Sequence, residues 1–282
     1  MVVNFFIAFI IWISLLGCNH LFYHPSRDYF VEVSELPFKI KTHKVQSTDG
    51  VLLDVWVWQT SDKPEALVVQ FHGNAENMSS HGFSLAWLVK KHNYALVTFD
   101  YRGYGKSSGK PSRQGLVEDG RAILSFFDRD PVLGELDIFV VGQSLGGAVA
   151  VPALADKVPL NLAGVILEST FSSYREITRS KLAQFWLSWP LQMPLSYLVS
   201  EDFSPVDYIS KLSVPVLVIH GSGDQIVPPD SSLRLYEKIE SRKSFWKVEN
   251  GRHLETFRFD FYQNKLVKYL CHLRVRKPCL TM

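Results

Sequence analysis

Residues 142–146 form the pattern Gly-x-Ser-x-Gly around Ser144, which places a serine hydroxyl in an unusual local context. The apolar segment 136–141 before it is typical of a buried strand, and the small residues 147–151 after it are typical of the start of a helix. A sharp turn between a strand and a helix pushes the hydroxyl outward, and flanking glycines lack the Cβ atoms that would clash there. The helix N-terminus adds partial positive charge that favours an oxyanion. We therefore interpret Ser144 as a nucleophile.

A serine hydroxyl is a weak nucleophile at neutral pH, so this role requires a base and a carboxylate that orients the base. Asp224 follows the strand-like segment 214–219, and His253 follows the strand-like segment 244–248. The chain order Ser, Asp, His is the one expected for a nucleophile on a strand–turn–helix unit. The carboxyl ends of parallel strands share one edge of a sheet, where such sheets carry their sites. The sequence therefore predicts a catalytic triad of Ser144, Asp224 and His253.

Other residues compete for the acid and the base. Glu168, at the end of another strand, and Asp207 are alternative acids. His72 and His220 also follow strand-like segments. His253 is preferred as the base because it follows the last strand, downstream of both the nucleophile and the acid. We expect His220 to be a packed residue beneath the loop that carries the acid.

An oxyanion hole needs two backbone N–H groups that point at one spot. Leu145 supplies one because it directly follows the nucleophile. The loop after the strand-like segment 66–71 supplies the other: Gly73 allows close approach of the backbone, and Asn74 is the expected donor. The glycine-rich segment 100–107 lacks the glycine positions of a nucleotide-binding loop. We expect that segment to brace loops at the edge of the site.

The rest of the chain alternates between strand-like and helix-like segments. Asp49-Gly50 is a good hairpin turn signal, and short continuous apolar runs suit parallel strands buried on both faces. The pattern predicts an α/β fold with a mostly parallel central sheet, an N-terminal antiparallel hairpin and helices on both faces. Strands are expected at residues 39–47, 51–59, 66–71, 95–99, 138–141, 163–167, 214–219 and 244–248. Helices are expected at residues 78–92, 114–129, 145–157, 229–241 and 254–272.

One long connection interrupts this alternation. Residues 171–210 are rich in aromatic residues and proline and include Trp186 and Trp189. Long connections without a simple pattern usually carry function. We expect a small cap over the sheet here, inserted into one domain that spans residues 37–273. The alternative is an irregular connection packed on the core.

The first residues differ from the rest of the chain. The apolar run Phe5–Leu16 is short for a membrane span, which takes about 20 residues, and is typical of a secretory signal. Its end, Leu-Leu-Gly-Cys at residues 15–18, resembles a bacterial lipobox. We expect lipidation of Cys18, a tether over residues 19–36, and a lipoprotein that faces the periplasm or the exterior. An uncleaved anchor over Val2–Cys18 and an ordinary cleaved signal remain open; each alternative places the protein at a membrane or beyond it.

Composition bounds the remaining possibilities. A net charge of +2 without a basic stripe predicts no nucleic-acid partner. Cys271 and Cys279 lie near the C-terminus, where a disulfide and two unpaired thiols in a loose tail over residues 274–282 are both open. His20 and His24 are spaced like metal ligands on a helix, but no third ligand is near them in the sequence, so we expect no metal site.

Taken together, these motifs resemble the α/β-hydrolase superfamily over roughly residues 37–273. The closest resemblance is to a subgroup of membrane-associated hydrolases that contains esterases, lipases and protein depalmitoylases. The matching motifs are residues 72–75, 100–105, 142–146 and 168–171, Asp224 with residues 227–228, and His253. One departure is Glu76, where the subgroup commonly has glycine.

The resemblance implies a serine hydrolase of the carboxylesterase or lipase type. Its nucleophile would be Ser144, its base His253 and its acid Asp224, with oxyanion donors at Asn74 and Leu145. It would act without a metal or organic cofactor on a small-molecule or lipid acyl ester or thioester. A serine peptidase or amidase of the same fold and a non-catalytic membrane-tethered binding protein are the alternatives.

Overall fold

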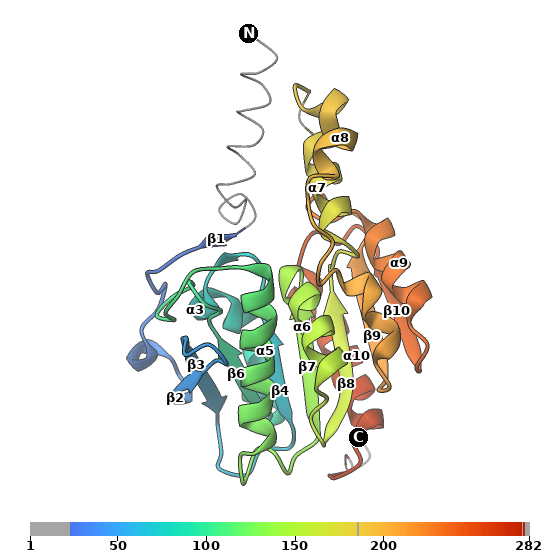
Figure 1. Cartoon of the computed structure of the whole chain (residues 1–282). Helices are drawn as coiled ribbons and strands as arrows, with labels where there is room; N and C mark the ends of the chain where they lie inside the picture. The colour runs from blue at the N-terminus through green and yellow to red at the C-terminus, as the bar shows by residue number, and fades with distance from the viewer. Residues whose placement is uncertain (1–22, 185, 278, 280–282) are drawn as a thin grey trace.

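An eight-stranded sheet forms the centre of the molecule (Figure 1). The computed structural model describes residues 23–184, 186–277 and 279. The strand order across this sheet is β10-β9-β8-β7-β4-β6-β3-β2. Its strands are β2 (Lys39–Gln46), β3 (Leu52–Gln59), β4 (Leu67–Phe71), β6 (Ala95–Phe99), β7 (Ile138–Gln143), β8 (Leu162–Glu168), β9 (Val216–Gly221) and β10 (Lys243–Val248).

The expected antiparallel hairpin forms one edge of the sheet. β2 and β3 pair antiparallel, and the turn between them contains Gly50 at a φ of 85°, which glycine adopts without strain. β3 also pairs antiparallel with β6, whereas the strands from β6 to β10 are mutually parallel. The carboxyl ends of these parallel strands therefore share one edge of the sheet, which we call the carboxyl edge. The α/β-hydrolase fold predicted from the sequence is confirmed.

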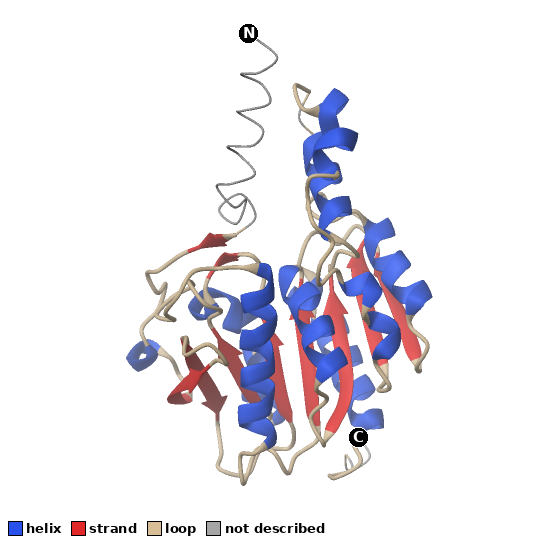
Figure 2. Cartoon of the chain, viewed as in Figure 1, coloured by secondary structure: helices blue, strands red, loops and turns tan. Residues whose placement is uncertain are grey.

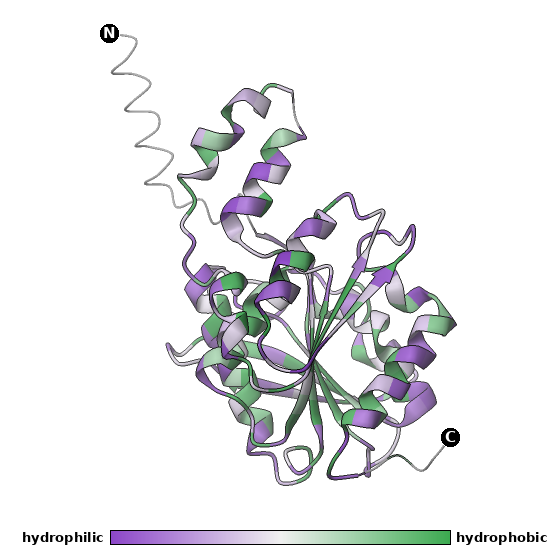
Figure 3. Ribbon diagram, turned by 90° about the vertical axis from the view of Figure 1, so that its right-hand side faces the viewer, coloured by the Kyte–Doolittle hydropathy of each residue, from purple (hydrophilic) through white to green (hydrophobic). Residues whose placement is uncertain are grey.

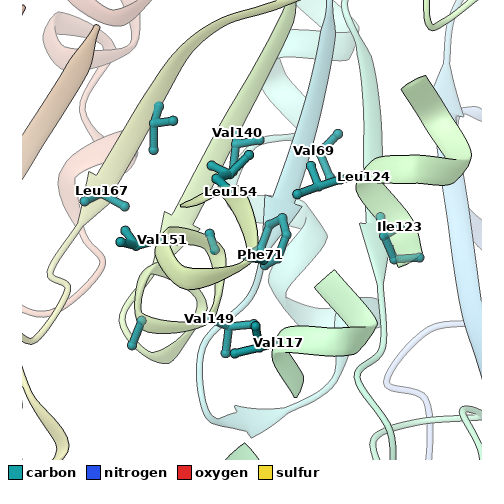
Figure 4. Close-up of a cluster of buried hydrophobic side chains, with 14 of the residues drawn as sticks. Val69, Phe71, Val117, Ile123, Leu124, Val140, Val149, Val151, Leu154 and Leu167 are labelled. Atoms are coloured by element: carbon teal, nitrogen blue, oxygen red, sulfur yellow. The ribbon is translucent and has the colours of Figure 1, made fainter. Parts of the chain in front are cut away.

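Helices cover both faces of the sheet (Figures 1 and 2). Successive strand residues point to opposite faces, so Val140 packs in one apolar cluster and Val141 in the other. Figure 4 shows part of the first cluster, where side chains of α5 and α6 meet those of the strands. The helices of the first face are α5 (Arg113–Asp128), α6 (Leu145–Asp156) and α9 (Pro229–Lys238). Those of the second face are α3 (Met78–His81), α4 (Ala86–His92) and α10 (Asp260–Leu273).

Two helices are shorter than their sequence patterns predict. The segment expected as one helix over residues 78–92 is divided by a 3-10 turn at Gly82–Ser84, where a methyl group on Gly82 would lie 2.6 Å from the Trp58 ring. The last helix begins at Asp260 rather than at residue 254, because Leu254 has a φ of 56° and cannot continue a right-handed helix. A 3-10 turn, Thr256–Arg258, fills the gap.

The segment expected as a tether packs on the domain in its described part. Tyr23 is buried, and β1 (His24–Pro25) pairs with β5 (Ala75–Glu76) in the loop after β4. A short 3-10 turn follows at Val33–Glu35. Lipidation of Cys18 and the other expectations for residues 1–18 lie outside the described residues. Within the ranges that the structure covers, no helix is long and apolar enough to cross a bilayer.

The C-terminal segment folds back on the amino ends of the strands. Cys271 and Cys279 form a disulfide, so the alternative of two unpaired thiols is not what the structure contains. The Asp137 carboxylate accepts hydrogen bonds from the backbone N–H groups of residues 275–277. Arg274 is buried and pairs with Glu65 at 2.8 Å. Residues 274–277 are therefore an ordered part of the domain rather than a loose tail.

The long connection between β8 and β9 forms a helical hairpin beyond the carboxyl edge (Figures 1 and 3). It contains α7 (Tyr174–Ala183), a 3-10 turn at Trp189–Leu191 and α8 (Gln192–Ser196). Two further 3-10 turns, Pro205–Asp207 and Ile209–Lys211, lead back to the sheet. We call the part from α7 to α8 the hairpin.

Candidate active site

Ser144 lies at the turn between β7 and α6, and its backbone has a φ of 55° and a ψ of −118°. A positive φ is uncommon for a residue with a side chain and clusters at functional sites. The Ser144 N–H donates to the carbonyl oxygen of Glu168 on β8 at 2.9 Å, which holds the turn in place. The side chain is mostly covered, with 9% of the residue exposed. The turn is therefore fixed by the sheet while its side chain stays at the carboxyl edge.

The glycines of the turn allow the start of α6 to contact the sheet backbone directly. A methyl group on Gly146 would lie 1.9 Å from the Phe71 carbonyl oxygen and 2.7 Å from that of His72. A methyl group on Gly142 would lie 2.5 Å from the Cα of Gly147. Both positions therefore exclude any side chain. This close contact also brings the first N–H groups of α6, which have no partners within the helix, beside the loop after β4.

Asp224 and His253 meet at the same edge. Nδ1 of His253 lies 2.8 Å from Oδ2 of Asp224, and 19% of the histidine side chain is exposed. The other carboxylate oxygen, Oδ1, accepts from the N–H groups of Ile226 and Val227 at 2.8 and 3.0 Å. A histidine that donates through Nδ1 carries its lone pair on Nε2, where it can accept a proton. The pair thus provides an oriented base.

The surroundings of Asp224 keep its carboxylate charged. Burial raises its pKa, but hydrogen bonds from His220 and His253 outweigh that effect and hold the pKa well below its usual range. His220 itself is buried; its Nε2 lies 3.2 Å from Asp224 and 3.0 Å from the carbonyl oxygen of Val227. It therefore packs beneath the acid loop, as the sequence predicts, and braces that loop.

Three loops converge beside Ser144. A methyl group on Gly73 would lie 3.8 Å from the carbonyl oxygen of Gln143 and 3.8 Å from Cδ1 of Leu254. Gln143 directly precedes the serine, and Leu254 directly follows the histidine. The loop after β4, the turn after β7 and the loop after β10 are thus neighbours in space, although they are far apart in the sequence.

Asn74 is held by a tyrosine from the neighbouring loop. The Tyr104 hydroxyl lies 2.9 Å from both the carbonyl oxygen and Oδ1 of Asn74. The His24 N–H also donates to Oδ1, at 3.3 Å. These contacts orient the loop in which the second oxyanion donor is expected. Leu145, the other expected donor, is the first residue of α6 and is buried.

The alternative acids and bases have other partners. Asp207 is exposed in a 3-10 turn. His72 is buried, and burial holds its pKa well below the usual value. Glu168 is also buried, and burial raises its pKa. Its carboxylate accepts from Nε2 of Gln143 at 2.8 Å and from the N–H of Thr256 at 3.2 Å.

Glu168 therefore joins the two sides of the site, which sequence reasoning missed. Gln143 precedes the serine, and Thr256 lies three residues after the histidine. The network continues as Nε2 of Gln70 donates to Oε1 of Gln143 at 2.6 Å. The available signal was a run of polar residues at the ends of otherwise apolar strands, since such residues must pair when buried.

Expected braces at the edge of the site are present. The Arg102 guanidinium pairs with Asp119 at 2.7 Å and with Asp49 at 2.6 Å, which ties three segments together. Asp100 accepts from the N–H of Met78 at 2.8 Å. Among the described residues, no group of three or more His, Cys, Asp or Glu side chains could hold a metal ion.

The doubly covered sheet and the turn at its carboxyl edge define an α/β hydrolase. The chain belongs to the family described as serine aminopeptidase, S33, which matches residues 62–206. A second family, described as PhoPQ-activated pathogenicity-related protein, matches residues 192–279.

Relatives and solved structures agree with this class. The chain is 30% identical over 263 residues to protein bem46 of Schizosaccharomyces pombe, covering 90% of this chain and 84% of that one. It is 28% identical over 274 residues to the uncharacterized protein YfhR of Escherichia coli K12, covering 94% and 92%. The fold is similar to that of the Pyrococcus furiosus esterase Pf2001, with a TM-score of 0.70 at 21% identity and coverage of 89% and 97%. The protein is thus a hydrolase of the α/β-hydrolase fold.

Proposed function

We propose that this protein is a serine hydrolase that cleaves carboxylic ester or thioester bonds of acyl substrates. The observation that carries the proposal is the hydrogen bond between His253 and Asp224 at the edge where the Ser144 turn also lies. An oriented base beside a strained serine turn is the arrangement that nucleophilic catalysis requires. The fold similarity to an esterase supports ester substrates.

In the proposed mechanism, Nε2 of His253 takes the hydroxyl proton as Oγ of Ser144 attacks the substrate carbonyl carbon. The carbonyl electron pair moves to the oxygen, and the N–H groups of Asn74 and Leu145 stabilise this oxyanion. The intermediate collapses to an acyl-enzyme, and His253 protonates the departing alcohol or thiol. Water, deprotonated by the same nitrogen, then releases the carboxylic acid. Asp224 keeps the imidazole in the required tautomer and stabilises its cation.

The substrate is proposed to be a small-molecule or lipid acyl ester, reached from a membrane to which the N-terminus attaches the protein. Support comes from the apolar run Phe5–Leu16 and from the lipobox-like residues 15–18. Lipidation of Cys18 is the proposed form of attachment, with the domain facing the periplasm or the exterior. An uncleaved anchor over Val2–Cys18 would serve the same purpose.

The test is hydrolysis of p-nitrophenyl esters from acetyl to palmitoyl by the full chain in detergent and by its Ser144→Ala variant. We expect Ser144→Ala to lower kcat by about 10⁴-fold or more, because the nucleophile is lost. Its circular dichroism spectrum and unfolding midpoint should stay close to those of the unaltered chain. Equal rates for the two proteins would contradict the assignment, and the preferred chain length would indicate the size of the acyl pocket.

A peptidase or amidase is the second candidate, and the description of the matching family as serine aminopeptidase favours it. The same triad can attack an amide carbonyl. Aminoacyl p-nitroanilides offered beside the esters would separate the two functions by their kcat/KM ratio. A folded chain that reacts with no substrate and with no covalent serine probe would indicate a non-catalytic, membrane-tethered binding protein.

A further inference from the structure

The outer part of the hairpin exposes a segment that has no charged side chain. Residues 182–200 contain no Asp, Glu, Lys or Arg. Trp186 is 76% exposed and Leu198 is 67% exposed, where a soluble surface would ordinarily show charged residues. Contiguous exposed apolar patches mark interaction sites. We call residues 182–200 the tip; its most exposed large apolar side chains are Trp186, Leu187, Trp189, Leu191, Tyr197 and Leu198.

Polar contacts fix the base of the hairpin, so the exposure of the tip does not come from a detached segment. Glu176 on α7 pairs with Arg234 on α9. The Arg113 guanidinium lies over the Tyr174 ring, 3.8 Å from its centre. Nε2 of Gln184 donates to the carbonyl oxygen of Gln225 in the acid loop at 3.2 Å. The base is thus anchored to the domain, and the tip is held away from it (Figure 3).

The N-terminal end of the described chain lies at the same edge. β1 pairs with β5 in the loop that carries Asn74, and α7 follows β8 at the carboxyl edge (Figure 1). Only five peptide units separate Cys18 from Tyr23, and an extended chain of that length spans at most about 17 Å. If Cys18 marks the membrane surface, the carboxyl edge lies within about that distance of the bilayer. The hairpin projects from this edge.

We propose that the tip inserts into the interface of the bilayer and turns the Ser144 edge toward the lipid. This inference rests on the proposed attachment of the N-terminus to a membrane. Tryptophan, tyrosine and leucine are the side chains that favour the boundary between headgroups and acyl chains. The flanking cations, Arg179 and Lys181, suit phosphate headgroups, and residues 177–200 contain no acidic side chain. An acyl substrate would then enter the site directly from the lipid phase.

The first test measures insertion without reference to catalysis. The full chain is reconstituted into phosphatidylcholine vesicles with or without bromine on the acyl chains, since bromine quenches tryptophan fluorescence by contact. The matched variant is Trp186→Phe with Trp189→Phe, which keeps both positions aromatic. We expect bromine to quench a smaller share of the fluorescence in this variant, because the quenched tip tryptophans are gone. An equal quenched share in both proteins would overturn the proposal.

The second test compares substrates in and out of a membrane. The tip variant carries Leu187→Ser, Leu191→Ser and Leu198→Ser. We expect at least about a tenfold loss of activity on a long-chain ester in vesicles, because interfacial binding scales with buried apolar area, and no change on soluble p-nitrophenyl acetate. The matched control replaces three exposed apolar residues at the opposite edge of the sheet. Those residues are Val132, Leu160 and Val275, each changed to Ser.

The outcomes separate this inference from the proposed function. Equal losses in the tip variant and the control variant would overturn docking. A chain that hydrolyses no ester but shows tip-dependent quenching would overturn the ester hydrolase and leave docking intact. If sedimentation shows a dimer that the tip variant dissociates, and quenching is absent, the tip binds a second copy of this chain and the bilayer is excluded.

Discussion

Two uncharged segments of similar length have opposite environments in this molecule. Residues 138–155 form β7, the serine turn and most of α6, and nearly all of their surface is buried. Residues 182–200 form the tip of the hairpin, and most of their large apolar side chains are exposed. The absence of charge alone therefore does not determine burial. The difference lies in the available partners: β7 has a strand on each side and helices on both faces, whereas the tip has a fixed base and open surroundings.

The same difference indicates what each segment does. In the buried segment, each atom contacts others at close range, and this rigidity holds Ser144 in a strained backbone conformation. In the exposed segment, uncovered apolar area offers binding energy to another phase. Changes in the two segments should therefore have very different effects on the free energy of unfolding.

The largest effect is expected for Gly146→Ala in the buried segment. The added methyl group would lie 1.9 Å from the Phe71 carbonyl oxygen, and the β4 backbone cannot move aside without breaking its pairing with β7. We expect the free energy of unfolding in urea to fall by about 3 kcal/mol or more, or the chain to become insoluble. Ser200→Thr, which adds one methyl group at an exposed position of the tip, is the control. Similar stability for both variants would remove the contrast between the segments.

A smaller effect concerns pH, because the sheet edge buries carboxylic acids. Burial raises the pKa of Asp100 to about 7, so the folded chain holds a proton that the unfolded chain releases near pH 4. This contribution to stability is fully present below about pH 4 and is lost as pH rises to about 7, at up to about 1.4 kcal/mol per pH unit. Asp100→Asn cannot titrate. Its free energy of unfolding should therefore fall less steeply over that range, and parallel curves for the two proteins would contradict the expectation.

The smallest effect is expected in the tip. Leu187, Leu191 and Leu198 are each more than half exposed, so replacing all three with serine removes little packing. Without lipid, we expect the free energy of unfolding to change by less than about 0.5 kcal/mol. A urea titration checks this. A loss of about 2 kcal/mol or more would mean that the tip packs on the domain and is not a free surface.

Local patterns were sufficient to predict the sheet and the neighbourhood of the site. A strand followed by Gly-x-Ser-x-Gly and a helix start located Ser144, and the ends of two further strands located Asp224 and His253. These inferences work because parallel strands present their carboxyl ends at one edge, so position along the chain becomes position in space. Helix boundaries were less accurate where one backbone angle decided them, as at Leu254.

The sequence by itself determined the alternation of strands and helices, the serine turn and the loops that carry the candidate acid and base, because each depends on neighbouring residues. Only the tertiary structure decided the pairing of β1 with β5, the Glu168 bridge between Gln143 and Thr256, and the outward direction of the hairpin. These features join segments that are distant along the chain. Hydrophobic periodicity records which faces are apolar, but it does not record which distant segment, or which surrounding phase, will cover them.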